Sequence, residues 1–210
     1  LEESIFPSDC TLGSIDVKSM YTNIPHKEGI KACIDRLYTN NPQSDDMPIP
    51  PNAMTDLLKI VLENNYFQFA DQIYLQVQGT AMGTRMAPAY ANLFMAQLEE
   101  SLLEGYHTKP LMWKRYIDDI LVVWPEDTDS LHEFVRYLNN SHPTIKFTLT
   151  CSESTIDFLD LTIYKGTRFH NQGRLDLKPY FKSTNKFQYL AYNSAHPRHV
   201  FASLIKGELS

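Results

Sequence analysis

The sequence has few cysteines, no long apolar run and no excess of positive charge, and each absence excludes a class of protein. Its 210 residues include three cysteines, Cys10, Cys33 and Cys151. Their number is odd and their spacing contains no Cys-x-x-Cys pair, which argues against a disulfide framework or a zinc site. We therefore expect an intracellular, reducing location, nuclear or cytoplasmic, with cysteines that fill small apolar spaces.

Hydrophobic segments are all short. No window of about 18 consecutive apolar residues occurs, so the sequence predicts no transmembrane helix and no membrane partner. The start, Leu1-Glu2-Glu3-Ser4, lacks an initiator Met and the features of a signal peptide, and we expect a piece of a longer protein. With 43% hydrophobic and 12% aromatic residues, the chain can still fill the core of one domain.

Positive charge is scarce overall, because the formal net charge is −6. This argues mildly against a nucleic-acid binder, but the distribution of charge matters more than its sum. Basic residues gather late in the chain. Of these, Lys178, Lys182 and Lys186 are candidates for contact with nucleic-acid phosphates. The alternative is a merely solvated basic face.

The most informative segment is Tyr116-Ile117-Asp118-Asp119, which lies between the apolar runs 111–113 and 120–124. This pattern predicts two strands joined by a tight turn. Asp is depleted in strands, and two adjacent carboxylates repel unless a cation neutralises them. Asp16 ends another short apolar strand. Three carboxylates at the ends of neighbouring strands predict a two-metal phosphoryl-transfer site for Mg²⁺; the alternative is ordinary turn aspartates.

The remaining pattern alternates between helices and strands. Helices are expected from Pro25 to Leu37, from a cap at Asn52, over 89–103, from Ser130 to Leu138 and over 196–209. A hairpin is expected at 67–77, and single strands are expected at 145–150, 156–164 and 175–181. A polar loop is expected at 39–52 and a polar turn at 171–173. This order predicts an α+β fold with an antiparallel sheet backed by helices.

Several ordered motifs resemble those of reverse transcriptases. The resemblance covers the first catalytic motif (16–25), the loop that packs against template and nucleotide (78–83 with 87–88), the Tyr-x-Asp-Asp turn (116–119), the following strand (158–161) and the primer-gripping hairpin with the start of the thumb (180–185 to 196–197). In wording these motifs are similar to Penelope-like retroelements. The resemblance covers about residues 10–205.

The resemblance implies a reverse transcriptase domain fragment over 1–210, with a palm at about 10–181, a primer grip and thumb start at about 178–210, and truncated fingers and thumb. It implies an RNA-directed DNA polymerase from a retroelement polyprotein. The partners would be an RNA template, a DNA primer and a dNTP, with an endonuclease domain elsewhere in the full-length protein. Two Mg²⁺ ions would be the cofactors, and Mn²⁺ could substitute.

The resemblance also implies residue roles. Asp16 and Asp118 would bind both metals, the Val17 carbonyl would be a further ligand, and Asp119 would orient the site. Tyr21 would lie against the sugar, with a core tyrosine as the alternative, and Gln78 and Gly79 would contact the nascent base pair. Tyr116 and Arg85 would contact nucleic acid, although a surface salt bridge is the alternative for Arg85. The primer would be bound by Lys178, Lys182 and Lys186, and the acid that protonates pyrophosphate would be Lys146 or Lys165.

Three other functions stay open. An RNA-dependent RNA polymerase shares the paired aspartates but usually has an acid, not an aromatic residue, five positions after the first Asp, so Tyr21 favours deoxynucleotides. A two-metal nuclease would not need the Gln78-Gly79 loop. The third alternative is a non-catalytic nucleic-acid-binding or scaffold domain derived from a retroelement.

Overall fold

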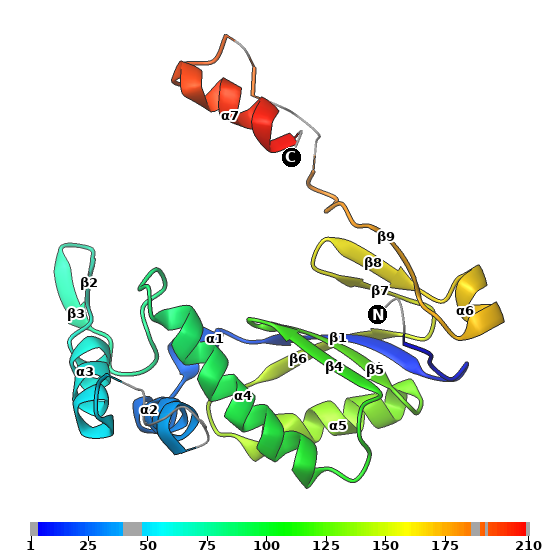
Figure 1. Ribbon diagram of the computed structural model, residues 1–210, viewed down its shortest axis with the longest axis horizontal. Coiled ribbons are helices and arrows are strands. Elements are labelled where there is room, and N and C mark those ends of the chain that lie inside the picture. The colour runs from blue at the N-terminus through cyan, green and yellow to red at the C-terminus, as the bar shows by residue number, and fades with distance from the viewer. Residues whose placement is uncertain (1–3, 40–47, 186–189, 192, 209–210) are drawn as a thin grey trace. The chain divides into compact units, whose positions relative to one another are not determined.

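The structure, a computed structural model, describes residues 4–39, 48–185, 190–191 and 193–208 (Figure 1). The chain divides into two compact units, Leu1–Pro179 and Tyr180–Ser210. The second unit contains α7 (Arg198–Glu208). The first unit contains β1 (Thr11–Val17), α1 (Met20–Asn23), α2 (His26–Ile34), the π-helix η1 (Asp35–Thr39), α3 (Pro51–Glu63), β2 (Tyr66–Phe69), β3 (Gln72–Leu75), α4 (Ala87–Gly105), β4 (Met112–Tyr116), β5 (Asp119–Trp124), α5 (Thr128–Ser141), β6 (Phe147–Ser152), β7 (Thr155–Phe158), β8 (Leu161–Tyr164), α6 (Thr167–Gln172) and β9 (Asp176–Pro179).

A four-stranded antiparallel sheet with the order β4-β5-β1-β6 lies at the centre of the first unit. The strand β1 is internal, and its Ile15 pairs with Ile120 of β5 on one side and with Leu149 of β6 on the other. The predicted α+β fold, an antiparallel sheet backed by helices, is therefore confirmed.

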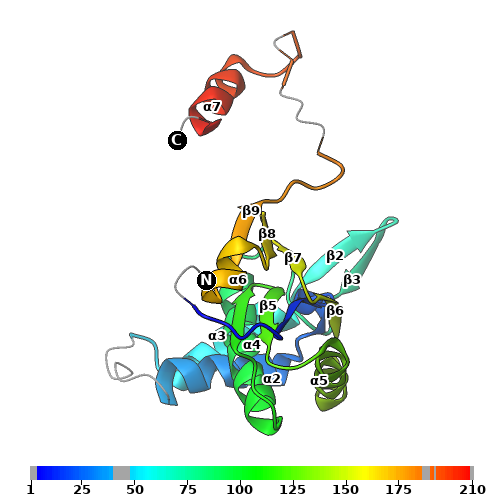
Figure 2. The same ribbon diagram turned by 90° about the vertical axis from the view of Figure 1, so that its right-hand side faces the viewer.

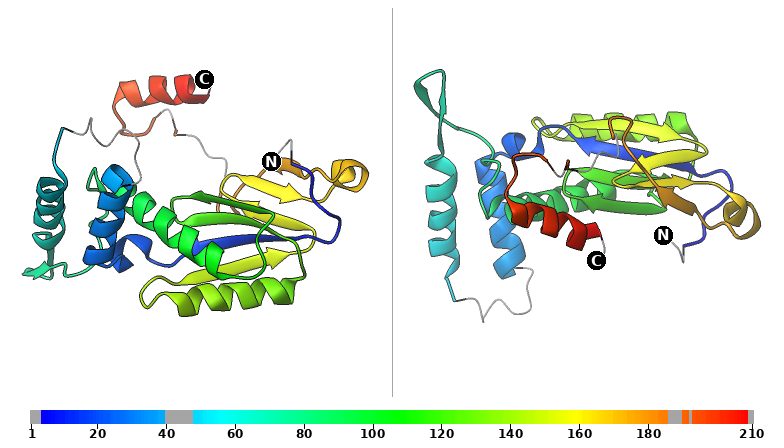
Figure 3. Two further views of the ribbon diagram at one scale, coloured as in Figure 1. Left: turned by 60° about the horizontal axis from the view of Figure 1, so that its bottom comes forward. Right: turned by 90° about the horizontal axis from the view of Figure 1, so that it is seen from above.

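One face of this sheet is covered by α4 and α5 (Figures 1 and 3). Alternate residues of a strand point to opposite faces, so Ile15 and Val122 point toward the helices. There they share a core with Phe134 of α5 and Trp124, whose rings stack with centroids 4.7 Å apart. We call this the helix-side core.

The opposite face is only partly covered, by the three-stranded sheet β7-β8-β9. Leu12 of β1 and Leu121 of β5 pack there against Ile156 and Ile163. Because β5 is covered on both faces, residues 120–124 are all buried, which explains its unbroken apolar run. Further along the same face of β1, Asp16 is exposed. This face is therefore closed at one end and open at the end that carries Asp16.

The helices α2 and α3 and the hairpin β2-β3 extend from one end of the central sheet (Figures 1 and 3), and the hairpin projects beyond the helices (Figure 2). Cys33 of α2 is buried in the helix-side core, to which Tyr90 and Phe94 of α4 also belong. Cys10 is also buried, so both cysteines are apolar fillers, whereas Cys151 is half-buried. None of the helices in the described ranges is long and apolar enough to cross a membrane.

Every predicted helix start is shifted by one or two residues, including those of α4, which begins at Ala87, and α7, which begins at Arg198. Pro25 is the N-cap of α2 and not its first residue, and α3 begins at Pro51, which places Asn52 inside the first turn. The helix α5 begins before Ser130, because the Asp127 carboxylate accepts a hydrogen bond from the Ser130 N–H at 2.9 Å. Asp is a preferred N-cap residue, and it satisfies a backbone donor that has no partner within the helix.

Three further elements also differ from those that the sequence predicted. The helix predicted to Leu37 ends at Ile34 and continues as η1. The single strand expected over 156–164 is the hairpin β7-β8, with Leu159 in a left-handed conformation at its turn. The polar turn expected near 171–173 is instead the end of α6, where Gly173 is the left-handed C-cap. Residues 40–47 of the predicted polar loop, and Lys186, lie outside the described residues.

Candidate active site

Asp16 and Asp119 are paired directly across β1 and β5. Asp118 precedes Asp119 in the hairpin turn, and its carbonyl accepts a hydrogen bond from the Val17 N–H at 3.0 Å. Asp16 lies two residues from Ser14 and four from Leu12, so it belongs to the sheet face that β7-β8-β9 leaves open at this end. The structure thus brings the three predicted acids and Val17 together.

The turn that carries Asp118 has an unfavourable backbone. Ile117 and Asp118 connect the paired residues Tyr116 and Asp119, and Ile117 has φ 57°. A left-handed conformation is rare for a β-branched residue, and glycine would adopt it at lower cost. The Ile117 side chain packs against the helix-side core. Strained residues of this kind cluster at functional sites, because the surrounding structure must hold them there.

The donor set fits a hard divalent cation. Carboxylates and a backbone carbonyl are the oxygen ligands that Mg²⁺ prefers. Thr148 Oγ1 of β6 adds a hydroxyl 3.4 Å from Asp16 Oδ2. In the described part of the chain, no three His, Cys, Asp or Glu side chains are gathered as a metal-binding group. The backbone register places Asp16 opposite Asp119, and the Asp118 carbonyl accepts the Val17 N–H beside them.

The loop before α4 packs on the backbone that follows Asp16. The Gly79 N–H donates to the Ile24 carbonyl at 3.1 Å, and the Thr80 N–H donates to the Tyr21 carbonyl at 2.7 Å. Gly79 has φ 73°, and a Cβ there would lie 2.4 Å from the Tyr21 oxygen and 2.5 Å from Thr22 Cα. The backbone of α1 therefore excludes a side chain at this position even without a nascent base pair.

This contact predicts the effect of Gly79→Ala. We expect the free energy of unfolding to fall by about 2–4 kcal/mol, from about 1 kcal/mol of left-handed strain and about 1–3 kcal/mol of overpacking. Urea unfolding measures the change. Gly83→Ala is the control, because Gly83 also has a positive φ, 97°, but a Cβ added there would meet no atom within 4 Å. Equal losses for both variants would show that the contact with α1 contributes nothing.

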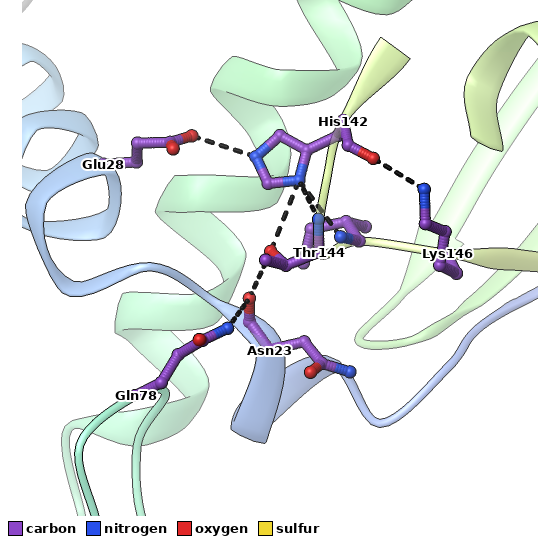
Figure 4. Close-up of polar contacts among 7 residues, drawn as sticks. Asn23, Glu28, Gln78, His142, Thr144 and Lys146 are labelled. Carbon is purple, nitrogen blue, oxygen red and sulfur yellow. Dashed lines mark hydrogen bonds and ion pairs between the residues drawn. The ribbon is translucent and has the colours of Figure 1, made fainter. Parts of the chain in front are cut away.

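Hydrogen bonds hold Gln78 beside α1 (Figure 4). Its Nε2 donates to the Asn23 carbonyl at 3.1 Å, and the same carbonyl accepts from Thr144 Oγ1 at 2.6 Å. The Gln78 carbonyl in turn accepts from Gln76 Nε2 at 2.9 Å. The amide of Gln78 is therefore oriented by the Asn23 carbonyl of α1, which also accepts from Thr144.

Buried His142 supports this arrangement from the neighbouring segment (Figure 4). Its Nδ1 lies 3.3 and 3.0 Å from the backbone N–H groups of Thr144 and Ile145. Because both groups can only donate, Nδ1 is unprotonated, and Nε2 donates to the Glu28 carboxylate at 2.9 Å. The sequence pattern did not indicate this histidine, because its partner Glu28 lies in a distant segment of the chain.

The two lysines considered as general acids both bind main-chain carbonyls. Lys146 Nζ donates to the carbonyls of Asn139 and His142, at 2.5 and 2.8 Å. Lys165 Nζ donates to the Ser8 carbonyl at 3.0 Å and also to that of Cys10. Both lysines therefore have structural roles that the sequence did not indicate.

The other predicted contact residues lie on different elements of the two units. Tyr116 is exposed and pairs with Asp119, whereas half-buried Tyr21 packs against the helix-side core. Arg85 is exposed and forms no ion pair with any described residue. Lys178 lies in β9, with Nζ 5.6 Å from the centre of the Tyr164 ring. Lys182 is exposed in the second unit.

Comparison with known families identifies the family of the chain. The model of the family described as reverse transcriptase (RNA-dependent DNA polymerase) matches residues 5–163. Because this match covers more than half of the chain, the chain belongs to the reverse transcriptase family, a class of nucleotidyl-transferring polymerases. No protein of curated function matches the sequence significantly.

Solved polymerase structures share the fold. Telomerase from Candida tropicalis in complex with a TWJ fragment of telomeric RNA has a TM-score of 0.59 and 13% identity, covering 95% of this chain and 33% of that chain. The telomerase from Candida albicans with the same kind of RNA fragment has a TM-score of 0.57 and 13% identity, covering 83% and 32%. The RNA-dependent RNA polymerase of a human picobirnavirus has a TM-score of 0.53 and 11% identity, covering 81% and 32%. The chain thus has a polymerase palm fold and spans about a third of the length of these proteins.

Proposed function

We propose that this chain is the palm of an RNA-directed DNA polymerase, and that it transfers nucleotides from dNTPs to the 3′-hydroxyl of a DNA primer on an RNA template. The observation that carries the proposal is the pairing of Asp16 with Asp119 beside the strained turn at Asp118. The family match supports the polymerase class. The motif wording supports a retroelement of the Penelope-like type as the source, with an endonuclease domain elsewhere in the protein.

Each acid has a distinct part in this proposal. Asp16 and Asp118 would hold two Mg²⁺ ions, for which Mn²⁺ could substitute, with the Val17 carbonyl as a further ligand. When bound, such ions lower the pKa of an attacking hydroxyl and stabilise charge on the triphosphate. Asp119, directly opposite Asp16, would orient its neighbours.

The surrounding residues would bind the substrates. Tyr21 would limit the space beneath the sugar, and the anchored Gln78-Gly79 loop would support the nascent base pair. Tyr116 and Arg85, both exposed, would contact nucleic acid, and the late lysines Lys178, Lys182 and Lys186 would follow the primer phosphates. The palm would span about 10–181, and the primer grip with the thumb start about 178–210.

Primer extension tests this proposal, including the metal requirement. We expect the longest reading frame that contains this chain to extend a DNA primer on RNA with dNTPs. Chelation of divalent ions should abolish extension, and added Mg²⁺ or Mn²⁺ should restore it, because the carboxylates alone cannot stabilise a triphosphate. The control is an identical reaction with Ca²⁺, whose looser geometry suits this chemistry poorly. Extension that persists in chelator would contradict a two-metal mechanism.

A second candidate is an RNA-dependent RNA polymerase, which the fold likeness to the picobirnavirus enzyme favours. The two candidates differ in the sugar of the nucleotide they add. The same primer and template, supplied with ribonucleotides or deoxyribonucleotides, distinguishes them.

A further inference from the structure

Arg115 lies directly behind the turn that carries Asp118. It precedes Tyr116 in β4, so its side chain points to the opposite face of the sheet, toward α4. Its Nη1 donates to the carbonyl of Ile117 at 3.1 Å and to Asn92 Oδ1 of α4 at 2.7 Å, and its Nη2 donates to the Asn92 carbonyl at 3.3 Å. One guanidinium group therefore joins the turn to α4.

The same guanidinium forms a nearly buried ion pair. Arg115 Nε lies 2.9 Å from Glu99 Oε1, and the two side chains are only 10% and 12% exposed. That oxygen also accepts a hydrogen bond from Trp113 Nε1 at 3.0 Å. A buried charge of this kind must stay paired, because an unpaired one loses its hydration without compensation. The ion pair therefore holds the Arg115 guanidinium in a fixed position against α4.

We propose that Arg115 is a positioning residue, which holds the strained Ile117-Asp118 turn so that the Asp118 carboxylate faces Asp16. The proposal rests on the proposed function of these acids. A left-handed isoleucine persists only where its surroundings determine it, and Arg115 binds the carbonyl of that residue. Arg115 cannot touch the substrate side, since its side chain lies on the helix-covered face.

Arg115→Lys tests this role, because lysine keeps the charge but loses the planar fork that binds acceptors on three residues at once. The first measurement is amide hydrogen exchange at Val17, whose N–H bonds the Asp118 carbonyl. We expect about tenfold faster exchange at Val17. The Lys18 N–H, which bonds the Lys146 carbonyl on the other side of β1, should keep its protection.

The second measurement is Mn²⁺ binding, followed by electron paramagnetic resonance without nucleotide or nucleic acid. Residues that orient metal ligands typically affect metal affinity 10- to 100-fold, so we expect binding at least about tenfold weaker. In primer extension, the Mg²⁺ concentration for half-maximal rate should rise while the KM for dNTP stays unchanged. Arg136→Lys is the matched control, because the Arg136–Glu133 pair is exposed on α5.

Asn92→Ala is the second variant if Arg115→Lys does not fold. Asn92 is exposed, and its loss leaves the Arg115–Glu99 pair in place, so the same changes should appear with smaller size. Unchanged exchange at Val17 together with unchanged Mn²⁺ binding would overturn the proposal. Equal acceleration at Val17 and Lys18 would also overturn it, since this indicates general loosening. If the unmodified protein extends no primer, the proposed function fails, while the contrast between Val17 and Lys18 still decides the role of Arg115 in the turn.

Discussion

Asp118→Asn is expected to abolish primer extension while leaving the fold intact. Asparagine has almost the same shape but no charge, so it would hold a divalent ion far less strongly. We expect the variant to lose about 4 kcal/mol of transition-state stabilisation, which corresponds to about a 10³-fold lower rate. The measurement is kcat/KM for one dNTP on a fixed primer and template, with saturating Mg²⁺.

Measuring the stability of Asp118→Asn distinguishes the loss of a metal ligand from unfolding of the protein. Asp16, Asp118 and Asp119 lie at the same end of the sheet, and like charges repel, so the variant should unfold at the same or a slightly higher urea concentration. Asp129→Asn is the control, because Asp129 is an exposed acid in the first turn of α5. Undiminished extension by Asp118→Asn would remove the case for these carboxylates.

Tyr21→Val is expected to change the choice of sugar. If the ring lies beneath the incoming sugar, the 2′-hydroxyl of a ribonucleotide is pushed into it. Overpacking typically costs about 1–3 kcal/mol, or roughly 5- to 150-fold in rate. Valine should relieve this contact, so that ribonucleotide incorporation rises while deoxynucleotide incorporation stays measurable. The measurement is the ratio of kcat/KM for matched dNTP and rNTP pairs.

The ratio is needed because Tyr21 also packs against the helix-side core. A variant that loses packing lowers the active fraction for both nucleotides equally, and the ratio cancels this loss. Tyr74→Val, in the exposed hairpin β2-β3, is the control and should leave the ratio unchanged. An unchanged ratio for Tyr21→Val would mark Tyr21 as a core residue and would reopen the RNA polymerase and scaffold alternatives.

Local patterns predicted the elements whose partners lie nearby in the chain. The hairpin around 116–119 follows from two apolar runs that flank a short polar turn, and β4 and β5 are found there. The errors arose where two residues could give the same local signal or where the signal was weak. Asp127, rather than Ser130, caps α5. No Gly, Asn or Pro marks the turn at Leu159-Asp160.

The sequence by itself determined the family and the tight turn that contains Asp118, because these depend on residue type and short spacing. Only the tertiary structure decided that Asp16 pairs with Asp119, since alternation cannot select a partner strand about a hundred residues away. It also decided that β7-β8-β9 leaves this end of the sheet open. The contacts of Arg115 and His142 also depend on the tertiary structure, because buried polar groups take partners from whichever segments packing brings beside them.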